Sequence, residues 1–121
     1  MVSSKQKSYR NGIWAERFAC LYLMLKGYRI LGRRYKTPVG EVDIVALRAG
    51  TLAMVEVKLR KDLSTAVDAL GYKGRDRIIK AALHYIASHP RYQDYGLRFD
   101  LIAISSSLKI RHLDNAWQAE P

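Results

Sequence analysis

The chain has 121 residues, and 49% of them are hydrophobic, which is enough apolar content to close the core of one domain and excludes an intrinsically disordered chain. Its 21 Lys and Arg against 11 Asp and Glu give a formal net charge of +10, which favours nucleic acid over an acidic protein, a membrane surface or a role in solubility alone. Its single cysteine, Cys20, excludes an internal disulfide.

The start of the chain is polar and basic, and we expect residues 1–9 to be flexible. No leucine-rich run of the kind found in secretory leaders follows this segment, and no stretch approaches the ~18 apolar residues that a membrane span needs. We therefore expect a cytoplasmic protein without membrane contact, in which residues 10–118 form a single domain.

The first predicted elements are a helix, a strand and a turn. Apolar residues recur at near-helical spacing over residues 10–26, and Gly27 is a plausible C-terminal cap for this helix. Residues 28–34 predict a strand, and Pro38 and Gly40 then mark a turn.

Two segments rich in Val and Ile, residues 41–47 and 51–59, predict a hairpin across the short connection Arg48-Ala49-Gly50. The remaining elements are a mixed, loop-like segment over 60–74, an amphipathic helix over 75–88, and strands over 97–105 and 109–113. The order α-β-β-β-α-β-β predicts an α+β layer structure around a mixed sheet.

The hairpin determines which side chains face each other. If Ala49-Gly50 is its tip, Asp43 faces Glu56 and Glu41 faces Lys58. A four-residue loop gives the same pairing, whereas a three-residue loop shifts it by one. In the first two cases these four side chains gather at one end of a face that is otherwise apolar.

Two carboxylates directly across a strand pair repel each other, so a cation, a raised pKa or a bound metal must offset the repulsion. Carboxylate oxygens are ligands that Mg²⁺ or Mn²⁺ prefers. The alternative is a solvated strand end, because Glu-x-Lys is a common pattern. The sequence has no zinc-ligand spacing of Cys or His, no P-loop and no dinucleotide fingerprint.

The run Gly40-Glu41-Val42-Asp43-Ile44-Val45-Ala46, followed by Val55-Glu56-Val57-Lys58, resembles the PD-(D/E)xK nuclease superfamily. More narrowly, the chain resembles the small bacterial YraN-like proteins, a group of uncharacterised function. The resemblance also includes Gly12, Ala15-Glu16, Gly27-Tyr28, Arg98-Phe99-Asp100, His112 and Asn115-Ala116. It implies an α/β, restriction-endonuclease-like core of order α-β-β-β-α-β, in which helices flank a mixed central sheet.

The resemblance also implies roles for individual residues. It implies Asp43, Glu56, Lys58 and Glu16 as the catalytic set, and Asp43, Glu56, Val57 and Glu16 as the residues at a Mg²⁺ or Mn²⁺ ion. Lys58 would orient or activate the attacking water. Glu41 lies close by, and we interpret it as a support of the site or a partner of Lys58.

Basic residues flank the motif on both sides in sequence, and as a set they predict a phosphate-binding rim, although any one of them can be a solvated charge. They are Arg33, Arg34, Lys36, Arg60, Lys61, Lys73, Arg75 and Arg77.

Three functions are compatible with these observations. The first is a metal-dependent endonuclease acting on DNA, such as branched or damaged DNA. The second is a non-catalytic nucleic-acid-binding protein that keeps the nuclease-like fold. The third is an interaction subunit in which the acidic cluster only holds a sheet edge. A homodimer is also open, because related junction-cutting enzymes act on two-fold symmetric substrates.

Overall fold

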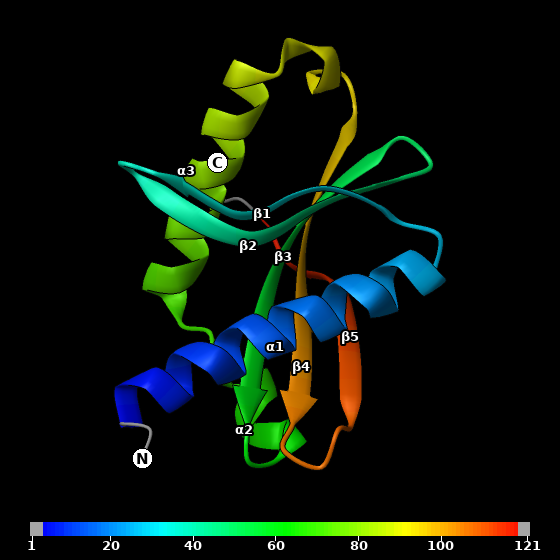
Figure 1. Cartoon of the computed structure of the whole chain (residues 1–121). Helices are drawn as coiled ribbons and strands as arrows, with labels where there is room; N and C mark the ends of the chain where they lie inside the picture. Colours follow the sequence, from blue (N-terminus) through cyan, green and yellow to red (C-terminus); the bar gives the residue numbers. More distant parts are fainter. Residues whose placement is uncertain (1–3, 119–121) are drawn as a thin grey trace.

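A computed structural model describes the backbone of residues 4–118 and the side chains of residues 11–118. It is a five-stranded sheet with helices on both faces (Figure 1). In chain order the elements are α1 (Ser4–Leu25), β1 (Arg29–Thr37), β2 (Gly40–Arg48), β3 (Thr51–Arg60), α2 (Leu63–Val67), α3 (Tyr72–Ser88), the short 3₁₀ helix η1 (Pro90–Tyr92), β4 (Gly96–Ser105) and β5 (Ile110–Trp117).

The strands lie in the order β1-β2-β3-β4-β5, and all neighbours are antiparallel except the parallel pair β3 and β4. The segment with α2 and α3 makes the crossover that a parallel pair requires. The predicted α+β class with a mixed sheet and flanking helices is therefore confirmed. None of the helices within residues 4–118 combines the length and apolar character that crossing a membrane requires.

Several boundaries differ from the sequence prediction. Strand β5 extends to Trp117 rather than residue 113, and β1 extends to Thr37 rather than residue 34. The loop expected over residues 60–74 contains α2, because Asp62 accepts a hydrogen bond from the backbone N–H of Thr65 and caps a short helix. Helix α3 begins at Tyr72 rather than residue 75. Helix α1 begins at Ser4 rather than residue 10, so the backbone of residues 4–9 is helical. Residues 1–3 of the segment expected to be flexible lie outside the described residues.

Two apolar layers hold the helices to the sheet. On one face, α1 packs on the sheet through buried residues that include Ala15, Ala19, Leu23, Ile44, Val55 and Ile102. On the other face, α3 packs through a second set that includes Val45, Met54, Ile78, Ala82, Tyr85 and Leu101. Strand β3 is thus covered on both faces, as the run of apolar residues at its start requires.

The predicted hairpin register is confirmed from Arg48↔Thr51 to Ile44↔Val55. Ala49 and Gly50 form its two-residue tip with φ of 49° and 77°, the positive values that a type I′ turn needs. The pairing ends at Ile44↔Val55, because β2 leaves β3 beyond this point.

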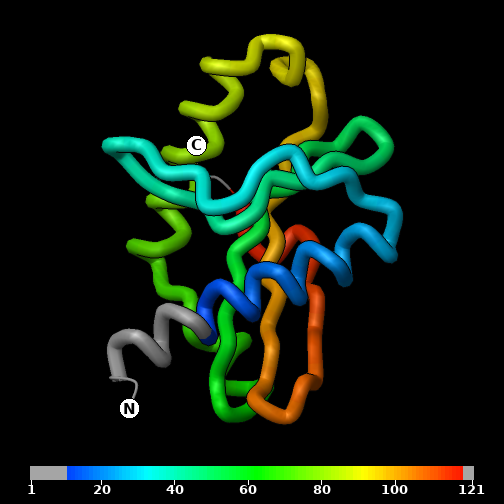
Figure 2. The backbone as a smooth tube through the Cα atoms, viewed as in Figure 1, coloured from blue at the N-terminus to red at the C-terminus, as the bar shows by residue number. Residues whose placement is uncertain are grey.

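The departure of β2 coincides with a bend in its other partner, β1. Arg34 has a φ of 53°, a left-handed conformation in the middle of β1, and lies between the pairs Arg33↔Ile44 and Tyr35↔Val42. The far end of the β1–β2 hairpin therefore turns away from β3 and reaches across α3 (Figure 2).

The end of this hairpin lies against the backbone of α3 at Gly40. A Cβ at this position would be 1.9 Å from the Arg77 carbonyl oxygen, so only glycine permits the approach. Because the strands have separated, neither predicted cross-strand pair, Asp43 with Glu56 or Glu41 with Lys58, is part of the β2–β3 ladder.

Candidate active site

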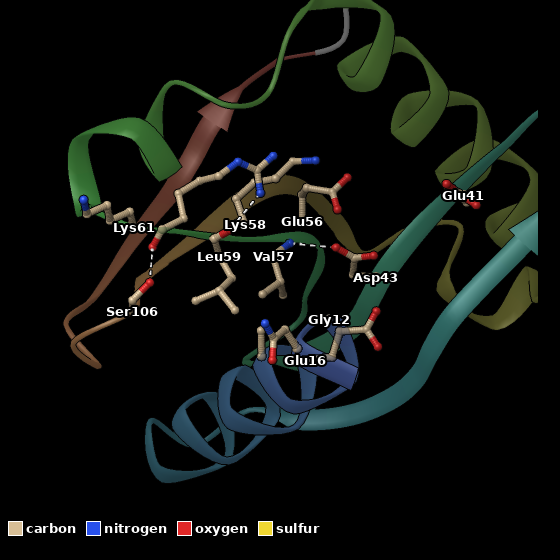
Figure 3. Close-up of a pocket in the computed structure, with 13 residues that line it drawn as sticks. Gly12, Glu16, Glu41, Asp43, Glu56, Val57, Lys58, Leu59, Lys61 and Ser106 are labelled. Carbon is tan, nitrogen blue, oxygen red and sulfur yellow. Dashed lines mark hydrogen bonds between the residues drawn. The ribbon is translucent and has the colours of Figure 1, made fainter. Parts of the chain in front are cut away.

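A pocket of about 550 Å³ opens where β2 leaves β3, beside the first half of α1. The four residues predicted as catalytic, Glu16, Asp43, Glu56 and Lys58, all line it. The other lining residues are Asn11, Gly12, Ala15, Glu41, Val57, Leu59, Arg60, Lys61 and Ser106. Residues from α1, β2, β3 and the end of β4 therefore meet at one place that only the tertiary fold creates (Figure 3).

Asp43 is held by β3, although β2 and β3 no longer pair at this position. Its Oδ2 accepts a hydrogen bond of 2.8 Å from the backbone N–H of Val57 on β3. The β2–β3 ladder has already ended at Val55, so the carboxylate takes the place of a strand carbonyl as the acceptor for this N–H. The side chain of Val57 packs in the apolar layer under α1, which leaves its backbone carbonyl as the group it can offer to a metal.

Glu56 lies beside Asp43 in a largely buried position. Burial, a hydrogen bond with Asp43 and the negative charge of Asp43 raise the pKa of Glu56 to about 9, against a smaller opposing effect of Lys58. The protonated form of Glu56 is therefore favoured beside Asp43. A divalent cation can take the place of such a proton between adjacent carboxyl groups.

Glu16 approaches the same pair from α1. Burial and then the negative charge of Asp43 raise the pKa of Glu16, while Arg34 and Arg33 lower it. Its carboxylate forms an ion pair of 3.1 Å with the Nε of Arg34, the residue at the bend of β1. Figure 3 shows Asp43 between Glu56 on one side and Glu16 on the other.

The donor set fits Mg²⁺ or Mn²⁺ with few protein ligands. Among residues 11–118, no three His, Cys, Asp or Glu side chains are grouped closely enough to form a complete metal cage. Asp43 and Glu56 supply two adjacent carboxylates, and an Mg²⁺ site commonly uses one or two carboxylates together with water and phosphate oxygens. Glu16 lines the same pocket and forms an ion pair with Arg34.

Lys58 and Glu41 have different surroundings. Lys58 follows Glu56 on the same face of β3, is partly buried and lowers the pKa of Glu56 through its charge. Glu41 is half-exposed at the pocket edge, where its Oε1 lies 3.9 Å from Arg77 of α3. Its observed ionic partner is thus Arg77 rather than Lys58.

The structure brings together about half of the predicted basic rim. Arg60 and Lys61 line the carboxylate pocket itself. Arg34 and Lys36 line an adjoining hollow with Glu16 and Asp43, and Arg33 with Arg34 lines another beside Glu16.

None of the α3 members of the predicted rim lines the carboxylate pocket. Arg77 lies at its edge, 3.9 Å from Glu41, and Lys73 is exposed in the first turn of α3. Arg75 lines a different pocket, next to the end of β5, which shares no residue with the carboxylate pocket.

Sequence reasoning missed the pocket residues Asn11 and Ser106. Ser106 reaches the pocket because β3 and β4 pair in parallel up to Arg60↔Ser105, and its N–H donates to the Arg60 carbonyl over 3.0 Å. No local signal in the sequence identifies such a contact, because it depends on the register of strands far apart in the chain.

A second polar cluster, the Asp100 network, lies on the α1 side of β4. Asp100 is fully buried and accepts two hydrogen bonds of 2.8 Å from the Arg98 guanidinium. His112 Nε2 lies 2.8 Å from the same carboxylate, and the Asn115 backbone N–H donates to it over 3.0 Å. Arg98 also donates to the Tyr28 hydroxyl.

A family model described as "Uncharacterised protein family UPF0102" matches residues 15–104, which include every carboxylate of the pocket. This chain belongs to UPF0102. The resemblance to the YraN-like proteins is thereby confirmed at the family level, and the fold is consistent with a restriction-endonuclease-like core.

UPF0102 proteins of several bacteria resemble this chain over most of their length. One from Rhodopseudomonas palustris (strain BisB18) is 46% identical over 94% of this chain and 84% of its own length. One from Caulobacter sp. (strain K31) is 48% identical over 88% and 77%, and one from Nitrobacter winogradskyi is 46% identical over 93% and 95%.

Proposed function

We propose that this UPF0102 protein is a Mg²⁺- or Mn²⁺-dependent endonuclease that hydrolyses phosphodiester bonds in DNA. The observation that carries the proposal is the pair of adjacent carboxyl groups of Asp43 and Glu56, which line one pocket together with Lys58, Arg60 and Lys61. Adjacent carboxylates that repel each other in a basic cleft are expected where a cation and a phosphate bind together.

In this proposal Asp43 and Glu56 hold the metal ion, and the backbone carbonyl of Val57 lies next to them in sequence. The Val57 N–H holds Oδ2 of Asp43 in place. When bound, the ion polarises the scissile phosphate and lowers the pKa of a water molecule at the site. Glu16, held by Arg34, orients water or the ion from the α1 side.

Lys58 acts on the reacting phosphate itself. Its ammonium group stabilises the negative charge that develops on the phosphate oxygens and orients the attacking water. Arg60 and Lys61 at one side, with Arg34 and Lys36 at the other, bind the flanking phosphates. The net charge of +10 supports the same partner.

One observation favours a second candidate, a nucleic-acid-binding protein that does not cut. Glu16 is engaged by Arg34, and the side chains described contain no group of three metal-ligating residues. In this second candidate the basic residues alone bind phosphates, and the carboxylates contribute nothing to affinity.

The test is cleavage of a labelled panel of branched, flapped, nicked and linear DNA with Mg²⁺ or Mn²⁺. We expect cutting that EDTA abolishes and that Asp43→Asn, Glu56→Gln or Lys58→Ala reduces by about 10³-fold. Asp94→Asn changes an exposed carboxylate outside the pocket and should leave the rate unchanged.

The second candidate predicts a different result. The protein would bind the same DNA with an affinity that falls steeply with salt, and it would not cleave it. Wild type, Asp43→Asn and Glu56→Gln would then bind with equal affinity.

A further inference from the structure

A second pocket, of about 650 Å³, lies between the start of α3 and the end of β5. We call it the Tyr72–Trp117 pocket, after the two aromatic residues that line it with Arg75. It shares no residue with the carboxylate pocket, so it needs an explanation of its own.

The pocket is built from stacked aromatic and cationic groups. Arg75 Cζ lies 5.6 Å from the ring centroid of Tyr72 and 6.0 Å from that of Trp117. Trp117 is buried and stacks on Phe99, with ring centroids 5.7 Å apart, so its side of the pocket is rigid. Tyr72, in contrast, is 87% exposed and presents an open ring to any ligand.

Two hydrogen-bond donors on residues that line this pocket lack acceptors. Arg75 Nε and Trp117 Nε1 are both buried without a hydrogen-bond partner within the described residues, and Trp117 is only 7% exposed. A buried donor left unpaired costs about 1–3 kcal/mol, and a bound ligand is one way in which such a donor gains its acceptor.

The positive charge of Arg75 has no ion-pair partner among the described residues. No Asp or Glu among residues 11–118 forms an ion pair with it, and Asp76, which also lines the pocket, is paired with Lys80 at 3.0 Å. Helix α3 adds the positive end of its dipole, because Gly71 provides no side-chain cap and the first turn contains no acidic residue. An anion is therefore the ligand that this charge pattern fits.

We propose that the Tyr72–Trp117 pocket binds one nucleotide of an unpaired strand, with the base stacked on Tyr72 and the phosphate on Arg75 and the start of α3. An exposed aromatic face next to an arginine is the arrangement by which proteins bind single-stranded nucleic acid. The inference rests on the proposed function for its ligand class, and it makes the substrate a DNA with an unpaired segment.

The test measures binding without cleavage, with full-length Asp43→Asn protein in EDTA. Its ligands are a labelled oligothymidine, a blunt duplex of equal length and an oligoglutamate peptide. We expect Tyr72→Ala to weaken oligothymidine binding by about tenfold and duplex binding by less than twofold. Tyr72→Phe should keep the affinity, and Arg75→Ala should lose about as much as Tyr72→Ala.

Arg91→Ala is the matched control, because Arg91 also lies over a tyrosine ring, that of Tyr92, at 5.2 Å and outside this pocket. Trp117 fluorescence in a Trp14→Phe background gives an independent readout, since a ligand on Arg75 changes the surroundings of the Trp117 ring. Oligothymidine should change this signal in the Tyr72→Phe variant, but not in the Arg75→Ala variant.

Three results would overturn the inference: equal affinity of Tyr72→Ala and its parent for oligothymidine, equal loss for single strand and duplex, or a preference for oligoglutamate. Its failure and that of the nuclease proposal are distinguishable. If cleavage depends on Asp43 but Tyr72→Ala binds oligothymidine normally, only the proposal for this pocket is contradicted. If Tyr72→Ala weakens binding but no DNA is cleaved, only the nuclease proposal is contradicted.

Discussion

The carboxylate pocket and the Asp100 network contain similar residues in opposite electrostatic states. In the pocket, Asp43 raises the pKa of both Glu56 and Glu16, so the carboxylates destabilise one another when charged. In the Asp100 network, a fully buried aspartate receives hydrogen bonds from Arg98, His112 and a backbone N–H. Burial alone would raise the pKa of Asp100, but these hydrogen bonds lower it below 3.8.

The difference separates a cluster that stabilises the fold from one that suits the proposed metal site. A buried charge with all its hydrogen bonds satisfied holds separate elements together, and here it joins β4, β5 and Tyr28 in the connection between α1 and β1. Carboxylates that raise one another's pKa are typical of sites where a bound ligand supplies the missing positive charge. The two clusters should therefore respond to mutation with opposite signs.

The largest expected effect is loss of the Asp100 network. Asp100→Ala should destabilise the protein by about 3 kcal/mol, because the half-buried Arg98 loses its carboxylate and the Asn115 N–H loses its acceptor. Asp114→Ala, at an exposed position on β5, should change the stability by less than about 0.5 kcal/mol. Equal effects in urea denaturation would contradict the assigned role.

The pH dependence of this network has a definite sign. Because folding lowers the pKa of Asp100, its contribution to stability is present above the ordinary value of 3.8 and is lost as the pH falls below it. Acid unfolding of the wild type should therefore be steeper below this pH than that of Asp100→Asn, as measured by circular dichroism.

The next effect concerns the hairpin that carries Asp43. Gly40→Ala places a Cβ against the Arg77 carbonyl and should cost about 2 kcal/mol while displacing β2 from α3. Gly32→Ala, where no atom lies within 4 Å of the added Cβ, is the control in the same hairpin. If thermal unfolding gives the two variants the same melting temperature, the end of the hairpin is not held on α3.

A smaller effect of opposite sign is expected at Glu56. Its raised pKa means that its stabilising contribution is complete below pH 4.5 and is lost as the pH rises toward 9. Glu56→Gln should therefore stabilise the protein by about 1 kcal/mol at pH 8 and by much less at pH 5. Urea titrations at both pH values measure this difference, and destabilisation at pH 8 would show that the Asp43–Glu56 pair is a structural one.

The pair also predicts how metal affinity depends on pH. A divalent ion must displace the proton on Glu56, so the affinity for Mn²⁺ should rise by up to about tenfold from pH 7 to pH 8. Calorimetry in two buffers of different ionisation enthalpy would detect the released proton. Proton release of zero would contradict the protonation of Glu56 beside Asp43.

The sequence was sufficient for the features that depend on local chemistry. Alternation of apolar residues and the Ala49-Gly50 turn predicted the β2–β3 hairpin and the contact of Asp43 with Glu56. The Asp62 cap of α2 could in principle be predicted from the sequence, because aspartate is a preferred residue at the N-cap of a helix.

The remaining features depend on tertiary structure. Arg34 adopts a left-handed conformation that an arginine does not signal, and this bend separates Glu41 from Lys58. The contact of Glu16 with Arg34 requires α1 to lie across the sheet, and the separation of Arg75 from the carboxylates requires the position of β5. No pattern within one segment contains this information.

The most direct test of the central claim is calorimetric titration of Mn²⁺ into the wild type, Asp43→Asn, Glu56→Gln and the exposed control Asp94→Asn. A metal site at the carboxylate pocket predicts saturable binding in the wild type and the control, and its loss in both pocket variants. Absent binding, or equal binding in all four proteins, would contradict the metal site and leave a basic DNA-binding protein on a nuclease-like fold.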